Sequence, residues 1–160
     1  MHFSIQWNMK KYLTLRQIGT LLFPTLLGLI VGLLLKEDFS YIESLPRTIQ
    51  VPPIVFPIVW TILYIVMGIY KELYNEDQTK DKKIDILYNL SLFFNVLFSI
   101  LLFGLHQKFL AFIDVVILLV LVSYMFINGY QNKNKYSYLL LPYVLWLFVA
   151  LSLMLDLISH

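Results

Sequence analysis

Ionisable side chains divide the chain into long apolar stretches. Four stretches contain no Asp, Glu, Lys or Arg, and a fifth contains a single acid, Asp114. About 20 apolar residues cross the hydrocarbon core of a bilayer, where charged side chains are costly. The pattern therefore predicts an all-α membrane protein, a five-transmembrane-helix bundle that forms a single domain over residues 1–160. The predicted helices cover residues 17–36, 53–73, 85–104, 109–130 and 138–158.

The connections between these helices differ in length and charge. Only the first, over residues 37–52, is long enough to fold over one end of the bundle. Nine Lys and Arg residues lie on the N-terminal side and three on the opposite side. For a bacterial plasma membrane, the positive-inside rule predicts a cytoplasmic N-terminus, with the long loop and the C-terminus outside. No A-x-A-like site follows the first apolar run, which favours a retained anchor over a cleaved signal peptide.

Composition supports the membrane assignment and excludes several functions. The 160 residues are 59% hydrophobic and 14% charged, with a mean hydropathy of +0.75, which is too apolar for a soluble domain. The absence of cysteine excludes disulfides, thiolate metal sites and covalent haem attachment. The three histidines are far apart in the sequence, so no metal site is expected. The scattered net charge of +2 indicates no nucleic-acid partner, and no catalytic motif is present.

Two of the predicted helices carry aromatic residues along one face. Trp60 and Tyr64 follow a proline at helical spacing in the second helix, and Tyr143 and Trp146 follow one in the fifth, with the small Ala150 beside the indole. Trp60 would lie roughly 10 Å inside the helix, below the interfacial belt where tryptophan is common. Packing against a neighbouring helix is one interpretation of these residues. We expect the other, an aromatic clamp in which the two helices hold a ligand between them.

The first and third helices carry residues that suit helix packing. Gly28 and Gly32 form a GxxxG pair, which is typical of close contact between helix backbones. Ser91, Asn95 and Ser99 share one face of the third helix, where they are expected to hydrogen-bond to a neighbouring helix. A dimer contact through this face, or a cavity facing Asn95, are the alternatives.

Asp114 is the one acid well inside a predicted helix. Such a residue is a functional candidate, with a proton relay as the obvious role. It lies about one and a half turns from the helix start, where the helix dipole and Lys108 or His106 can satisfy it. No second buried acid or histidine continues a relay, so we expect Asp114 to be a structural anchor.

Several motifs stand in a fixed order along the chain: FPTLLG, PPIVFPIVWTILYIVMG, FNVLFSILLFG, LAFID and LLLPYVLWLFVA. Together they resemble the translocator protein family, also called the tryptophan-rich sensory protein or peripheral benzodiazepine receptor family. The second helix of that family reads approximately PPxxxFxxxWTxLYxxMG. The resemblance covers nearly the whole chain, although Gln50 stands where the family usually has a loop tryptophan.

The resemblance implies a five-helix bundle, commonly a homodimer, with a pocket roofed by the first loop. Family members bind porphyrins, such as protoporphyrin IX or haem, and benzodiazepine-like drugs; the animal members also bind a sterol, for which no motif is legible here. Trp60 and Trp146 would be the pocket tryptophans, and no cofactor is required. Together with the tyrosines on the aromatic faces of the second and fifth helices, the candidate ligand-binding residues are Trp60, Tyr64, Asn95, Phe98, Tyr143, Trp146 and Ala150.

Three functions are therefore open at the level of sequence. The first is a membrane binding protein for tetrapyrroles or similar apolar rings, acting in their transport, scavenging or stress sensing. The second is a light-dependent breakdown of protoporphyrin, which some family members show. The third is a ligand-free protein that binds a partner through the Ser91, Asn95 and Ser99 face.

Overall fold

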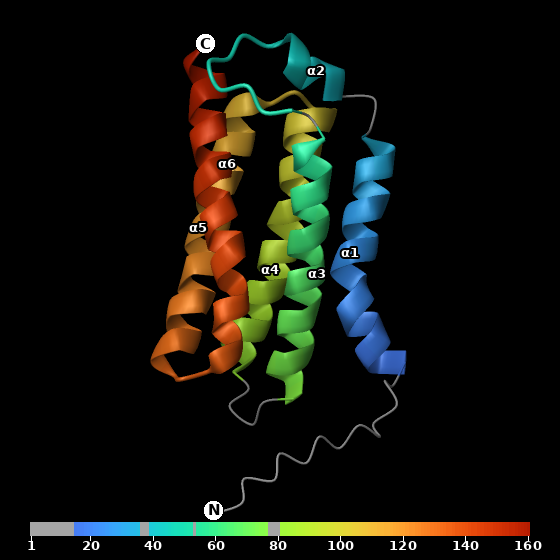
Figure 1. Cartoon of the computed structure of the whole chain (residues 1–160), viewed down its shortest axis with the longest axis vertical. Helices are drawn as coiled ribbons and strands as arrows, with labels where there is room; N and C mark the ends of the chain where they lie inside the picture. Colours follow the sequence, from blue (N-terminus) through green and yellow to red (C-terminus); the bar gives the residue numbers. More distant parts are fainter. Residues whose placement is uncertain (1–14, 36–38, 53, 77–80) are drawn as a thin grey trace, which may run out of the picture.

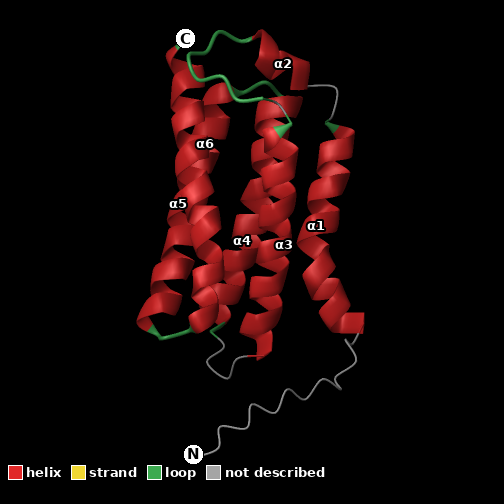
Figure 2. Cartoon of the chain, viewed as in Figure 1, coloured by secondary structure: helices red, strands yellow, loops and turns green. Residues whose placement is uncertain are grey.

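The structure is a computed structural model that describes residues 15–35, 39–52, 54–76 and 81–160. All elements in these residues are helical (Figure 2). Five helical segments are long and apolar enough to cross a membrane, which confirms the predicted fold class. The elements are α1 (Leu15–Leu34), α2 (Phe39–Ser44), α3 (Val55–Glu76), α4 (Lys82–Ser99), the π-helical η2 (Ile100–Gly104), α5 (Lys108–Gln131), the 3-10 helix η3 (Lys135–Leu140) and α6 (Leu141–Ser159).

The helix boundaries differ from the predicted ones by a few residues. α3 continues to Glu76 instead of ending at 73, and α4 begins at Lys82 instead of 85. The start of α4 is fixed by Asp81, whose carboxylate accepts a hydrogen bond from the Lys83 N–H at 2.9 Å. Helices thus continue past the apolar stretches, because backbone hydrogen bonds, not the hydrocarbon thickness, determine where a helix ends. The predicted limits at 36 and 53 and the basic cluster at 10–11 lie outside the described residues.

The bundle has a packed part and a peripheral helix. Buried side chains of α3, α4, α5 and α6 form one core cluster, while α1 contacts chiefly α3 (Figure 1). Within α1, Pro24 is the one buried residue, and large side chains such as Phe23 and Leu33 are exposed. Lipid tails are as apolar as leucine, so this exposure costs little in a bilayer. Most of the α1 surface is therefore suited to face lipid.

Two glycines allow α1 and α3 to approach closely. A β-carbon on Gly28 would collide with the ring of Tyr64, and one on Gly68 would collide with the backbone carbonyl of Leu21. A β-carbon on Gly32 would meet no atom within 4 Å. The packing role predicted for the GxxxG pair is therefore correct for Gly28 and wrong for Gly32. Gly68, on the opposite helix, makes the second close contact.

The polar face of α4 is buried in the bundle. Ser91 and Asn95 are 0% and 1% exposed and Ser99 is half-buried, so the first two are not available for the alternative dimer or partner contact. The Ser91 hydroxyl donates to the Tyr88 carbonyl at 2.7 Å. The Asn95 amide donates to the Ser91 carbonyl at 2.8 Å, and the Ser99 hydroxyl to the Asn95 carbonyl at 3.5 Å. These bonds return to α4 itself, so the expected hydrogen bonds to a neighbouring helix are not the ones formed.

Asp114 is also buried, with 2% of its surface exposed. Neither carboxylate oxygen accepts a hydrogen bond from any described residue. Lys108 instead donates to the Leu157 carbonyl at 3.1 Å, and the His106 ring stacks on Tyr41 with centroids 3.8 Å apart. Lys108 and His106 therefore contact other groups. The prediction that one of them satisfies the Asp114 carboxylate is wrong.

Candidate ligand pocket beneath the first loop

The chain after α1 forms a roof over one end of the bundle (Figure 1). The roof consists of α2 and residues 45–52, and the end of α6 fastens it. Asp156 Oδ2 accepts hydrogen bonds from the backbone N–H groups of Thr48 at 2.8 Å and Ile49 at 2.9 Å. His160 Nε2 lies 3.1 Å from Thr48 Oγ1. Two loop N–H groups that belong to no helix or sheet are satisfied in this way, so the roof has a defined position.

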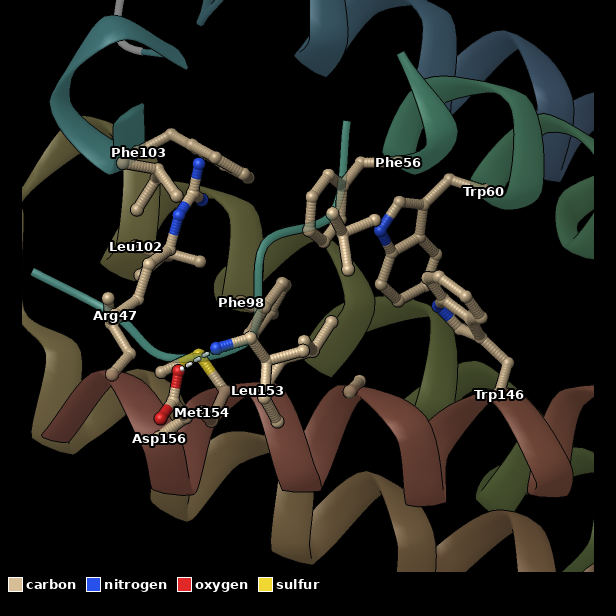
Figure 3. Close-up of a pocket in the computed structure, with 15 residues that line it drawn as sticks. Arg47, Phe56, Trp60, Phe98, Leu102, Phe103, Trp146, Leu153, Met154 and Asp156 are labelled. Atoms are coloured by element: carbon tan, nitrogen blue, oxygen red, sulfur yellow. Dashed lines mark hydrogen bonds between the residues drawn. The ribbon is translucent and has the colours of Figure 1, made fainter. Parts of the chain in front are cut away.

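A small pocket lies directly beneath the roof. Its volume is about 50 Å³, and its walls come from the loop, α3, the end of α4 and α6 (Figure 3). All of its lining residues are apolar except Arg47 and Asp156. The lining consists of Ile42, Arg47, Ile49, Val51, Phe56, Trp60, Phe98, Leu102, Phe103, Trp146, Ala150, Leu153, Met154, Asp156 and Leu157.

Two tryptophans from different helices meet at the inner end of this pocket (Figure 3). The Trp60 ring of α3 lies 6.0 Å from Phe98 and 6.5 Å, edge-on, from Tyr143. The Trp146 ring of α6 lies 6.4 Å, edge-on, from Phe56. These centroid distances are those of favourable aromatic pairs. The indole Nε1 of Trp146 is buried and has no hydrogen-bond acceptor among the described residues.

The π-helical segment η2 brings two further residues to the pocket. In this segment the Leu105 N–H donates to the Ile100 carbonyl at 2.8 Å, which spans five residues instead of the usual four. The wider turn allows Phe98 and Phe103, five positions apart, both to line the pocket. An α-helix would turn these positions about 140° apart.

The structure separates the candidate binding residues into three groups. Trp60, Phe98, Trp146 and Ala150 line the pocket beneath the roof. Tyr64 follows Trp60 on the same helix but lines a neighbouring groove. The remaining two, Asn95 and Tyr143, are 1% and 0% exposed and lie in the core; they line neither hollow.

Eleven lining residues lie outside the sequence-based set, and four of these are aromatic or charged: Arg47, Phe56, Phe103 and Asp156. Phe56 precedes Trp60 by one turn, so its place on the stripe could have identified it. Phe103 is hidden by the π-helical register. No motif or spacing near Arg47 or Asp156 indicates that they line a pocket. They come together from a loop and from a helix end 109 positions apart.

The groove beside the pocket lies between α1 and α3. It has a volume of about 340 Å³ and is lined mainly by apolar residues of these two helices, including Gly32 and Tyr64. Phe56, Trp60 and Phe103 line both hollows. These three aromatic side chains therefore form a partition, one side chain thick, between the pocket and the groove.

The described residues offer little for metal-based chemistry. They contain no group of three or more His, Asp or Glu residues that could hold a metal ion, and the chain has no cysteine. The pocket instead offers aromatic faces, one free indole N–H, and charge at one end. Such a lining is suited to bind an apolar ring compound.

Comparison with known proteins agrees with this geometry. A search of curated proteins found no match to this chain. A protein-family model, that of the TspO/MBR family, matches residues 20–159, which include every described helix that borders the pocket. The five membrane-spanning helices found here are the architecture expected of that family. The chain belongs to the TspO/MBR family and is an integral membrane protein.

Proposed function

We propose that the chain binds a flat apolar ring compound of the porphyrin class in the pocket beneath the roof. The observation that carries this proposal is the meeting of Trp60 and Trp146, from α3 and α6, on one pocket. Indole faces stack well on a conjugated macrocycle. The buried Trp146 N–H, which has no acceptor among the described residues, supplies one oriented donor for a ligand.

Binding of a ring this large requires the pocket to widen. Pockets for drug-sized ligands have volumes of about 300–1,000 Å³, whereas this one has about 50 Å³. The roof is the wall best able to move, because residues 45–52 form no helix and are held to α6 chiefly by Asp156. We therefore infer that the ligand enters as this segment lifts, and that the roof then closes over it.

The proposal extends to the membrane setting. We place the chain in a bacterial plasma membrane, with the start of α1 on the cytoplasmic side and the roof outside, because nine of its twelve Lys and Arg residues belong to the N-terminal side. Transport, scavenging or stress sensing would each use a site open to one face of the membrane. A homodimer, as in the family that the sequence resembles, would use lipid-facing surface, since the polar face of α4 is buried.

Titration of detergent-solubilised protein with protoporphyrin IX tests the binding proposal. We expect saturable binding in darkness, seen as a shift of the Soret band, and an affinity about three- to tenfold lower in Trp60→Phe and Trp146→Phe. Phe148→Leu is the matched control, because Phe148 lies two positions from Trp146 but is 54% exposed. Unchanged affinity in both tryptophan variants would remove the pocket from the proposal.

Illumination of the same samples separates binding from degradation. A binding protein leaves the porphyrin absorption intact in light. Loss of that absorption in the wild type but not in Trp60→Phe or Trp146→Phe would favour the light-dependent breakdown of the ligand. That alternative has one observation in its favour, since both tryptophans would lie beside a bound ring.

A further inference from the structure

The pocket is amphipathic along its length. Trp60 and Trp146 lie at one end, and Arg47 and Asp156 lie at the other (Figure 3). The residues between them are apolar. One part of a ligand that fills this pocket would contact aromatic side chains, and another part would contact ionic groups. The lining therefore favours a ligand with an apolar part and a polar part.

The two ionic groups are not equivalent, because one of them is already engaged. Asp156 Oδ2 accepts hydrogen bonds from the Thr48 and Ile49 N–H groups, and its other oxygen lies 3.8 Å from His160 Nε2. The two N–H groups occupy Oδ2, so this carboxylate is already engaged within the protein. No described residue accepts a hydrogen bond from the Arg47 guanidinium, and none forms an ion pair with it.

The bonds to Asp156 also place Arg47. They hold the backbone at Thr48 and Ile49, directly after Arg47, against α6. The Arg47 side chain is half-buried and extends along Leu102 and Phe103 on the pocket wall (Figure 3). Its alkyl stem can pack on these side chains while the guanidinium keeps its donors for another group. Asp156 is therefore a positioning residue for Arg47.

We propose that Arg47 recognises an anionic group of the ligand, so that the preferred occupant is an apolar ring compound that carries a carboxylate. This inference rests on the function proposed above and adds the charge of the ligand to it. The ring would lie against Trp60 and Trp146, and the carboxylate would lie at the roof. Guanidinium binds carboxylate through two parallel hydrogen bonds, which suits this geometry.

A matched pair of porphyrins tests the proposal: protoporphyrin IX, with two carboxylates, and its dimethyl ester, with none. We expect the wild-type protein to bind the acid about five- to tenfold more tightly than the ester at pH 7.4 and low salt, after correction for uptake by empty micelles. Arg47→Gln should weaken acid binding by that factor and leave ester binding unchanged. Arg47→Lys should keep part of the preference, and high salt should reduce it in the wild type.

The control variant is Lys82→Gln, which removes an exposed cation at the opposite end of the bundle. It should bind both porphyrins as the wild type does. Ester binding reports whether each variant is folded, since it does not depend on Arg47. An unaltered acid preference in Arg47→Gln, or equal affinity for acid and ester in the wild type, would overturn this inference and leave the proposed function standing. Failure of the wild type to bind either porphyrin would overturn both.

Discussion

The pocket and the groove on either side of Trp60 differ in size and polarity. The pocket beneath the roof has about 50 Å³ and an ionic end, whereas the groove between α1 and α3 has about 340 Å³ and a mainly apolar lining. The pocket is walled by side chains of the loop, α3, the end of α4 and α6. The groove lies beside the close contacts of α1 with α3 at Gly28 and Gly68, and a β-carbon on Gly32, which lines it, would meet no atom within 4 Å. The larger of the two spaces is therefore not the one that offers ionic groups to a ligand.

The strongest test of this difference fills each hollow in turn. Ala150→Phe places a ring in the pocket, and Gly32→Phe places one in the groove. We expect the first to lower protoporphyrin affinity at least about thirtyfold, or roughly 2 kcal/mol, because the pocket has no spare volume. The second should leave affinity unchanged, because the groove is not the proposed site and a β-carbon at position 32 would meet no atom within 4 Å.

Soret titration measures both affinities, and Ala150→Leu provides a milder version in case the phenylalanine variant does not fold. The opposite ranking, with binding lost in Gly32→Phe and kept in Ala150→Phe, would move the ligand to the groove.

A second test concerns how α1 is held beside the groove. Gly68→Ala would force a β-carbon against the backbone of Leu21, which cannot move aside cheaply. We expect a loss of about 1–2 kcal/mol, seen as a lower thermal unfolding midpoint in detergent. Gly32→Ala is the matched control and should be neutral or slightly stabilising, since alanine favours a helix by about 1 kcal/mol over glycine. Equal midpoints for the two variants would contradict the close contact.

A third test separates the roof from the groove. Asp156→Asn weakens the bonds to Thr48 and Ile49, so the roof should open more often. We expect trypsin to cleave after Arg47 several-fold faster, measured by mass spectrometry of timed digests, and Ser152→Ala on the exposed side of α6 to have no effect. Cleavage at the wild-type rate would show that Asp156 does not hold the roof.

The smallest expected effect concerns Thr25, whose hydroxyl lines the groove and is buried. Thr25 Oγ1 has no hydrogen-bond partner among the described residues. Thr25→Val keeps the shape of the side chain and removes that group, so stability should stay equal or rise by about 1 kcal/mol or less, and porphyrin affinity should not change. A clear loss of affinity would give the groove a recognition role that its lining does not suggest.

The features that the sequence predicts well are those with a regular period. The five spans follow from the spacing of charges, and the pairing of Trp60 with Trp146 on one pocket follows from two aromatic stripes. The same periodicity assigned Tyr64 to that site, but a small rotation along α3 turns Tyr64 towards the groove. A stripe defines a face of a helix and does not define which neighbour that face meets.

The contacts that could not be predicted from the sequence are made with backbone groups or with residues far away in the chain. Asp156 bonds to backbone N–H groups of Thr48 and Ile49, which any two residues could supply. Ser91 and Asn95 have the same spacing whether they bond to a second helix or, as here, to their own. Gly68 is recognisable only once Leu21 is known to lie opposite it. In each case the contact is long-range or made by the backbone, so composition and periodicity do not report it.

At the π-helical turn after α4, the number of residues in the segment determines which side chains line the pocket. Both Phe98 and Phe103 reach the lining because one extra residue is accommodated between Ile100 and Gly104. Deletion of a single residue there would restore an α-helical register and rotate one of the two rings out of the wall. The site could thus be lost with every lining side chain still present, through a change in the count of residues alone.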